Sequence, residues 1–508
     1  MVIVVLWLFG VRPACGQEAP ASSASEKTQA NQLPLSGRTG QTGNVKATQS
    51  PLPGVTTGVE TVSPNIQVQG SYTGSTRGAS VPAGTLSFTD AIRRGLEYNL
   101  GLTGQTQAVR QAQGQMKVAR STLLPNLSGY LNETVAQRNL RALGLGSGLV
   151  SPIPGFAIPS IVGPFNYFDV RATLTQTVLD LTARDNYRSA NEIVRAAQLI
   201  AQDARELVSL AVGGVYLQVI ATKAKLDSTR AQLETANALY DQALQQRRAG
   251  VVAQTDVNRS QIQWLTQQQR LLSLENDLAK QKISLARIIG LPLKDTYDIS
   301  DDVPFSPFTS ITLEDALLEA AEHRADLQAA KAQVRAAERA LSAARAERLP
   351  ALSVAADYGV IGTNPGQSHG TFNVAGNLRF PIWRGGRIEG NIAQAEAALG
   401  QRSAELEDIV GQIESDVRTA YLDMQTAASQ VEVAQKNILV SDQNLTLTRQ
   451  RFEEGVSDNV EVVQSQESVA VAQFDYINSV FAHNIAKLAL ARAMGIASNN
   501  FTRFLQVK

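Results

Sequence analysis

Four stretches of the chain alternate between apolar and polar side chains with a period of two residues. In the first, Leu127 and Leu131 alternate with polar neighbours, and the other three stretches lie near 168–175, 352–357 and 372–380. This period predicts β-strands with one apolar and one polar face. Strands of roughly ten residues can span a bilayer when tilted. A soluble sandwich would show the same alternation, so the strands alone do not decide between the two.

Long segments with a different period separate these strands. Residues 180–248 contain no proline, and apolar side chains recur there every seven residues. A turn at Ala249-Gly250 leads into a returning segment with the same repeat, which ends near Gly290. The repeated positions are Val219, Leu226, Leu233 and Tyr240, then Leu265, Leu272, Ala279 and Ala286. The pattern predicts a left-handed coiled pair whose longer helix extends for about 100 Å.

The chain contains this unit twice. LSFTDAIRRGLEYN at 86–99 matches ITLEDALLEAAEHR at 311–324, and Gly250-Val251 matches Gly455-Val456 further along. We therefore expect a first structural repeat over 85–300 and a second over 311–497, followed by a C-terminal tail over 498–508. The first copy has some twenty additional residues between 138 and 168, in a Gly/Pro-rich stretch typical of an enlarged loop.

Each repeat combines a shorter helix, two strands, a long helix and a returning helix. The shorter helices, 102–124 and 326–348, end at a Leu-Pro pair, because proline cannot continue a helix. The second long helix and its partner cover 383–451 and 458–495. A shorter and a returning helix stacked end to end match the length of one long helix.

One chain cannot satisfy these elements by itself. A globular domain cannot bury a helix pair of about 100 Å. Four strands cannot close a barrel, and an open sheet edge is not tolerated in lipid. Oligomerisation would solve both problems.

The N-terminus resembles an export signal. Residues 1–11 are apolar but too short for a spanning helix, and Ala14 and Gly16 have the spacing that a signal peptidase requires, which predicts a signal peptide over 1–16. Lipidation of Cys15 is an alternative, although Arg12-Pro13 makes a poor lipobox. Residues 17–84 are rich in Ser, Thr, Gly and Pro, and we expect them to be disordered.

The composition argues against several functions. The chain has 46 Lys+Arg and 46 Asp+Glu, so no bulk charge attracts nucleic acid. Three His and one Cys offer few ligands for a metal or haem. We find no nucleophile elbow and no phosphate loop, and predict neither enzymatic activity nor a cofactor. The body of the chain has no run of about 20 apolar residues, so any membrane crossing would use strands.

The ordered motifs resemble one known family. They include LSFTDAIRRGLEYNLGL (86–102), ARSTLLPNLSGYL (119–131), LTQTVLD (174–180), LRFPIWRGGR (378–387), RRAGVVAQTDV (247–257) and RFEEGVSDNVEV (451–462). Because these motifs occur in this order, the chain resembles the TolC-like outer membrane efflux proteins over 86–497. The resemblance implies a mainly α protein with a membrane β-barrel contribution. It also implies a homotrimer with a twelve-stranded barrel in outer-membrane lipid and a long periplasmic α-barrel.

The resemblance also assigns residues at the helical tips. A periplasmic adaptor would dock at the two helix–helix turns, on Gly250, Val251, Val252, Gly455 and Val456. Glycine alone explains each reversal structurally, since it adopts positive φ.

A channel constriction is implied close by. Three copies of Glu461 would form an acidic ring, with Asp458 and Asp256 as further candidates. The next acidic position of the family is Gln464 here, and the position of a latching tyrosine is Phe452. Asp256 has Arg451 as a candidate partner. The structural alternatives are a solvated helix carboxylate for Glu461 and an N-terminal helix cap for Asp458.

The function implied is an outer-membrane exit duct, opened by the adaptor and driven by an inner-membrane transporter of the RND or ABC class. Efflux of small organic molecules is the expected task, because the four Met do not favour soft metal ions. The alternative is a non-conducting coiled-coil scaffold or a periplasmic adaptor. An adaptor would carry one helical hairpin in a soluble β domain, whereas this chain has two hairpins interleaved with four amphipathic strands.

Overall fold

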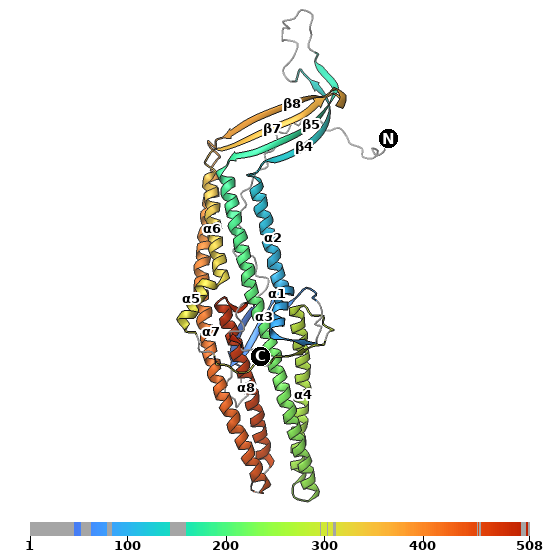
Figure 1. The fold of residues 1–508 in the computed structure, drawn as a ribbon, viewed down its shortest axis with the longest axis vertical. Coiled ribbons are helices and arrows are strands. Elements are labelled where there is room, and N and C mark those ends of the chain that lie inside the picture. Colours follow the sequence, from blue (N-terminus) through green and yellow to red (C-terminus); the bar gives the residue numbers. More distant parts are fainter. Residues whose placement is uncertain are drawn as a thin grey trace, which may run out of the picture.

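The computed structural model is a long column of helices with a β-sheet at one end (Figure 1). It describes residues 45–51, 62–78, 84–142, 159–294, 296–301, 303–307, 311–454, 456, 459–498 and 504–505. The predicted signal peptide with Cys15, and the tip residues Gly455 and Asp458, lie outside these residues.

The sheet contains four antiparallel strands in the order β4-β5-β7-β8. Their bounds are Asn126–Asn139 (β4), Ile161–Leu179 (β5), Ala351–Gly362 (β7) and His369–Arg379 (β8). The strands lie at the predicted places, but β5 extends well beyond the predicted 168–175. The two outer strands, β4 and β8, have no partner on their outer edges among the described residues.

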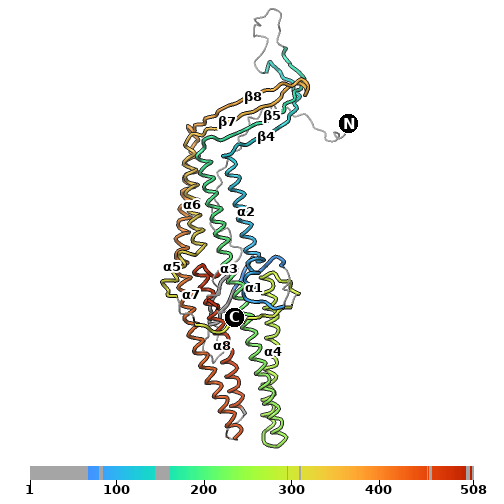
Figure 2. Tube along the Cα trace, viewed as in Figure 1, coloured from blue at the N-terminus to red at the C-terminus, as the bar shows by residue number. Residues whose placement is uncertain are grey.

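Two long helices run from the sheet to the far end of the column. They are α3 (Leu181–Arg248) and α7 (Arg387–Glu453). The helices α4 (Gln254–Ile289) and α8 (Asn459–Ala493) return along the lower half. The upper half is completed by α2 (Leu100–Ser121) and α6 (Ala325–Ala346), so pairs of shorter helices stack beside one long helix, as predicted (Figure 2).

The helix starts are encoded locally. The Asp180 carboxylate at the end of β5 accepts a hydrogen bond from the Ala183 amide and caps α3. The short helices α1 (Phe88–Tyr98) and α5 (Leu313–His323) begin alike, because Ser87 and Thr312 accept from the amides of Asp90 and Asp315.

The apolar core lies at mid-height, which we call the equator. Phe88 of α1 packs edge-on against Tyr216 of α3, with ring centroids 5.3 Å apart. The Tyr216 hydroxyl donates to the Leu86 carbonyl oxygen over 2.9 Å, so its polar end is satisfied in the core. Of the described helices, only α3 is apolar enough by length and composition to cross a membrane. The 18-residue window of α3 that meets this test is 67% buried, as in the core helix of a folded protein.

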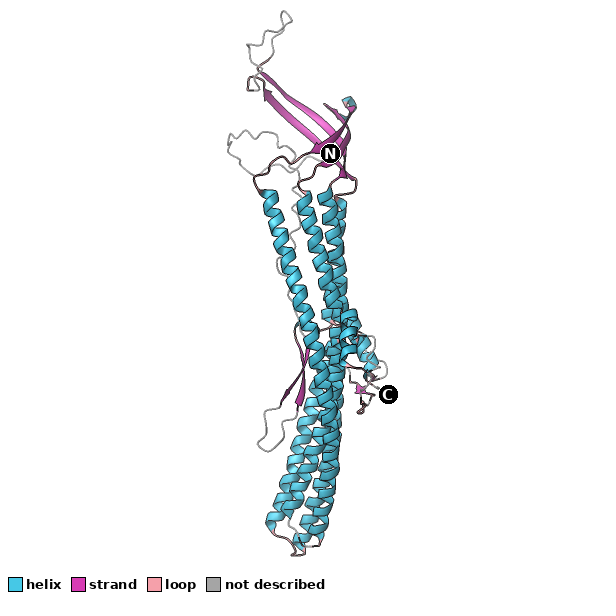
Figure 3. Ribbon diagram, turned by 90° about the vertical axis from the view of Figure 1, so that its left-hand side faces the viewer, coloured by secondary structure: helices cyan, strands magenta, loops and turns pink. Residues whose placement is uncertain are grey.

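The prediction that residues 17–84 are disordered is wrong for two stretches of this segment. β1 (Val45–Pro51) and β2 (Val62–Val68) pair as an antiparallel hairpin that contacts α3 and α8 beside the equator (Figure 3). The following turn buries Tyr72 against Gly101, and Asn99 donates to the Tyr72 carbonyl oxygen over 2.9 Å. These tertiary contacts order a segment whose composition alone favours disorder.

Candidate functional site at the helical tips

The two helix–helix turns at the lower end of the column use the same backbone motif. At the first, Gly250 has a φ of 75°, and the Val251 amide donates to the Gln246 carbonyl oxygen over 2.9 Å. At the second, the Val456 amide donates to the Arg451 carbonyl oxygen over 2.9 Å. A bond of this span is the outer bond of a Schellman C-cap, which usually places an apolar residue just after the glycine.

The apolar residues of these two turns point into solvent. The exposed fraction is 73% for Val251 and 68% for Val456, while Val252 is half-buried. Two further helix ends, at Gly290 and Gly495, have the same motif. There the apolar residues that follow, Leu291 and Ile496, are only 4% and 5% exposed. The exposure at the tips is therefore not a requirement of the turn, which makes the tips a candidate docking surface.

The predicted constriction residue is part of an ion pair. Glu461 Oε1 of α8 lies 2.9 Å from Arg451 Nη1 at the end of α7, and both side chains are about half exposed. An exposed pair of this kind contributes little stability. It nevertheless places the positive charge of Arg451 beside the predicted acidic position. The sequence had suggested Arg451 as a partner for Asp256 instead.

Asp256 lies in the first turn of α4. One carboxylate oxygen accepts from the Ala253 amide over 3.3 Å, and the other lies 3.2 Å from Arg259 Nη1. A carboxylate here satisfies a free amide and interacts favourably with the helix dipole. This local role accounts for the residue without any pore function.

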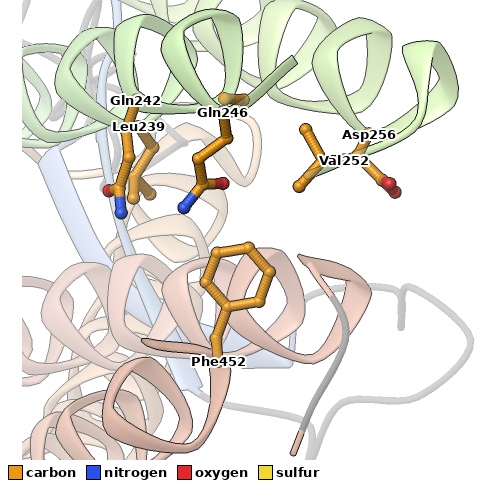
Figure 4. A pocket seen from close by; sticks show the side chains of 7 residues that line it. Leu239, Gln242, Gln246, Val252, Asp256 and Phe452 are labelled. Carbon is orange, nitrogen blue, oxygen red and sulfur yellow. The ribbon is translucent and has the colours of Figure 1, made fainter. Parts of the chain in front are cut away.

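The structure brings several predicted tip residues together around one small pocket (Figure 4). Its lining comprises Leu239, Gln242, Ala243, Gln246, Val252, Asp256 and Phe452. Phe452 at the end of α7 projects across the pocket toward the α3–α4 hairpin. The two tips of one chain therefore face each other through the aromatic ring of Phe452.

Polar contacts that the sequence did not predict join the two hairpins above this pocket. Glu467 of α8 accepts from Arg270 over 3.2 Å and from Gln263 over 3.5 Å, both on α4. Further up, Gln473 accepts from Ser228 over 2.6 Å and from Gln232 over 3.1 Å. The seven-residue repeat locates the helices, but it does not identify which polar residues on two such pairs become neighbours.

The sheet at the other end has two chemically opposite faces. Because of the strand register, Leu127, Leu174, Ala356 and Val374 form one row across all four strands. The adjacent row, on the opposite face, consists of Ser128, Thr173, Asp357 and Asn373. On this polar face, Arg171 pairs with Asp357 and lies 3.4 Å from Asp169.

Known proteins resemble this chain over both of its helical hairpins and both pairs of strands. The family model "Outer membrane efflux protein" matches residues 91–291 and again 316–496. The pyoverdine export outer membrane protein OpmQ of Pseudomonas aeruginosa is 26% identical over 334 residues, which cover 64% of this chain and 66% of OpmQ. The outer membrane protein OprJ of the same organism is 24% identical over 419 residues, covering 79% of this chain and 82% of OprJ.

A solved structure has the same fold. The CmeC outer membrane channel of Campylobacter jejuni superposes with a TM-score of 0.70 at 17% identity, over 81% of this chain and 86% of CmeC. The family model covers most of the described residues, in two matches that each contain two strands and a helical hairpin. The chain therefore belongs to the outer membrane efflux protein family, whose members work in the outer membrane and extend into the periplasm.

Proposed function

We propose that three copies of this chain form an outer-membrane exit duct, with a twelve-stranded barrel in the lipid and a helical tunnel in the periplasm. The observation that carries this proposal is the register of the sheet. It gathers apolar residues on one face and polar residues on the other, and among the residues that the structure describes it leaves the outer edges of β4 and β8 without a partner. Edge-to-edge pairing between copies satisfies both edges and leaves the apolar face for lipid.

The lower tips dock a periplasmic adaptor in this proposal. Val251, Val252 and Val456 provide the apolar contact, Gly250 allows the chain to reverse, and Gly455 occupies the matching sequence position at the second turn. Isolated exposed valines are common, but here two lie at equivalent turns on neighbouring hairpins.

Glu461 forms the constriction in this proposal, and Asp458 and Asp256 remain further acidic candidates from the sequence. The pairing of Glu461 with Arg451 reduces the repulsion among three acidic side chains around one axis. The closed tip therefore needs less stabilisation against charge repulsion than an unpaired acidic ring would.

An inner-membrane RND or ABC transporter drives the export of small organic molecules through the duct. The name of OpmQ supports an export role, since it is described as a pyoverdine export outer membrane protein. The interleaving of two hairpins with a four-stranded amphipathic sheet argues against a non-conducting scaffold or adaptor.

The test is photo-crosslinking in the native cell from probes placed at Val251 and Val456, followed by mass spectrometry. A matched probe at Val118, an equally exposed valine of α2 near the sheet, serves as the control. Capture of a periplasmic adaptor from the tips but not from Val118 would support the proposal. Capture of only further copies of this chain from both tips would overturn the docking site and favour a stand-alone pore or scaffold.

A further inference from the structure

The two junctions between sheet and long helix differ. After β5, the single residue Asp180 separates the strand from α3. After β8, residues 380–386, with the sequence FPIWRGG, precede α7. We call these residues the β8–α7 linker.

This linker has the most exposed large apolar side chains of the described residues. Ile382 is 95% exposed and Trp383 is 87% exposed. Asp180 shows that a sheet-to-helix junction can be made without such residues. Two unburied apolar side chains of this size therefore indicate a surface that something else covers.

The position of the linker identifies the covering environment. Arg379, the last residue of β8, pairs with Ala351, the first residue of β7, so the linker begins where the sheet ends. The apolar face of β8 includes the exposed Phe372, Val374 and Leu378, and the exposed Phe380 follows them at the same spacing. The linker thus continues the face proposed to meet lipid, at the level where the helices begin. Trp is enriched at such a water–lipid boundary because its ring is apolar and its N–H is polar.

A cation lies beside the tryptophan. Three other arginines near this junction have carboxylate partners, with Arg345–Glu396 at 2.8 Å, Arg348–Glu389 at 3.6 Å and Arg387–Glu347 at 4.0 Å. Among the described residues, no ion pair is made by Arg384, whose side chain is partly exposed. Arg379 makes no ion pair among the described residues either, but it ends β8 on the polar face of the sheet. A guanidinium with free donors can bind a phosphate in bidentate fashion.

We propose that the β8–α7 linker anchors the duct to the periplasmic leaflet by binding an anionic phospholipid. Trp383 and Ile382 enter the headgroup region, and Arg384 binds the lipid phosphate. This inference rests on the proposed function, since it requires the sheet to lie in a membrane. Three linkers around a trimer would fix the height of the helical tunnel relative to the bilayer.

The environment of Trp383 can be measured directly. The chain has three Trp, at positions 7, 264 and 383, so the Trp7→Phe/Trp264→Phe variant leaves Trp383 as the only tryptophan, whose emission can be excited selectively at about 295 nm. Phe at 264 keeps the aromatic stack on Tyr240, whose ring centroid lies 5.9 Å away. The variant is placed in nanodiscs whose lipids carry bromine at shallow or deep acyl positions. We expect the strongest fluorescence quenching from shallow bromines.

Two results would overturn different claims. Absence of quenching by any brominated lipid, in protein that has inserted into nanodiscs, would mean that a second copy covers Trp383, and the anchor would be wrong. Protein that does not insert into nanodiscs at all would overturn the proposed function, and the inference with it.

The phosphate contact needs a second measurement. In mixed bilayers, brominated phosphatidylglycerol should be enriched about fivefold near Trp383 over brominated phosphatidylcholine, the effect of one basic residue near an anionic surface. Arg384→Gln should abolish this preference. Arg348→Gln, which removes an arginine with a carboxylate partner, should retain it. A preference that persists in Arg384→Gln would contradict the phosphate contact.

Discussion

Helices at the tips and at the equator end with the same backbone motif, but the residue after the glycine is exposed at the tips and buried at the equator. At Gly250 and Gly290, φ is 75° in both cases, and an apolar residue follows. Val251 is 73% exposed, whereas Leu291 is 4% exposed. The backbone motif is specified locally by glycine, but burial depends on the tertiary neighbours.

The surroundings of the two glycines show the same difference. A Cβ added at Gly290 would lie 2.7 Å from the Thr76 carbonyl oxygen and 2.7 Å from Tyr98 Cβ. A Cβ added at Gly250 would have no described atom within 4 Å. At the equator glycine is needed for both backbone conformation and space, and at the tip only for conformation. The equator is therefore built for stability, while the tip is free to serve docking.

The largest effect should come from charging the tips. The Val251→Asp/Val456→Asp double variant places carboxylates in the proposed docking surface, where burial without a partner costs several kcal/mol. We expect adaptor affinity to fall more than about a thousandfold, because two such penalties add, with export reduced accordingly and the trimer intact. Adaptor pull-down and substrate accumulation measure this effect. Val118→Asp, at an exposed site outside the tips, is the matched control, and an equal loss in that variant would disprove the docking role.

Substitution of the apolar residue after the glycine at the equator should lower stability, whereas the same substitution at the tip should not. Ile496→Ala removes a buried side chain and should lower the free energy of unfolding by about 2–5 kcal/mol. Val456→Ala should change it by less than about 0.5 kcal/mol. Urea unfolding in detergent micelles compares the two variants. Similar shifts for both would mean that the tip valine is buried in the assembled protein.

The stability of the equator should depend on pH, whereas the tips should lack this dependence. His483 is fully buried at the equator, and burial together with the positive Lys487 lowers the pKa of His483 from 6.5 to about 4. Because the pKa is lower in the folded state, the unfolded chain binds more protons between these values. The stability contribution is fully present above pH 6.5 and is lost as the pH falls to 4, an effect of roughly 3 kcal/mol.

Hydrogen exchange measured from pH 7 to pH 4 tests this prediction. After correction for the intrinsic rates, protection should decrease in α8 around His483, and His483→Gln should reduce that pH dependence. Amides around Gly250 should not follow this titration. An equal pH response in the variant would assign the effect to carboxylates instead.

The long helices were predictable because their signal is local. The expected helix 180–248 is observed as Leu181–Arg248, since the seven-residue repeat and the capping residue Asp180 both lie within the segment. The strands were located by alternation, although β5 extends to 19 residues. Alternation weakens toward the end of this strand that begins at Ile161, so the sequence underestimated it.

Features that depend on contacts between distant segments were not predictable. The hairpin β1–β2 is made of residues typical of disorder, and it gains its order from contact with α3 and α8. The sequence likewise suggested Arg451 as a partner for Asp256, whereas in the structure Arg451 forms an ion pair with Glu461. Residues on both sides of a turn can pair in several ways, and the geometry of the turn selects among them.

The smallest expected effect is the difference in stability between alanine substitutions at Gly250 and Gly290. Gly250→Ala should cost about 1–2 kcal/mol, the penalty for a side chain at positive φ, because there is space for the added methyl group. Gly290→Ala incurs the same backbone penalty and must also displace the Thr76 carbonyl and Tyr98, so it should cost clearly more. Urea unfolding of the two variants measures the difference. Equal costs would mean that the segment around Thr76 moves aside freely, and that residues 70–78 are not an integral part of the equatorial core.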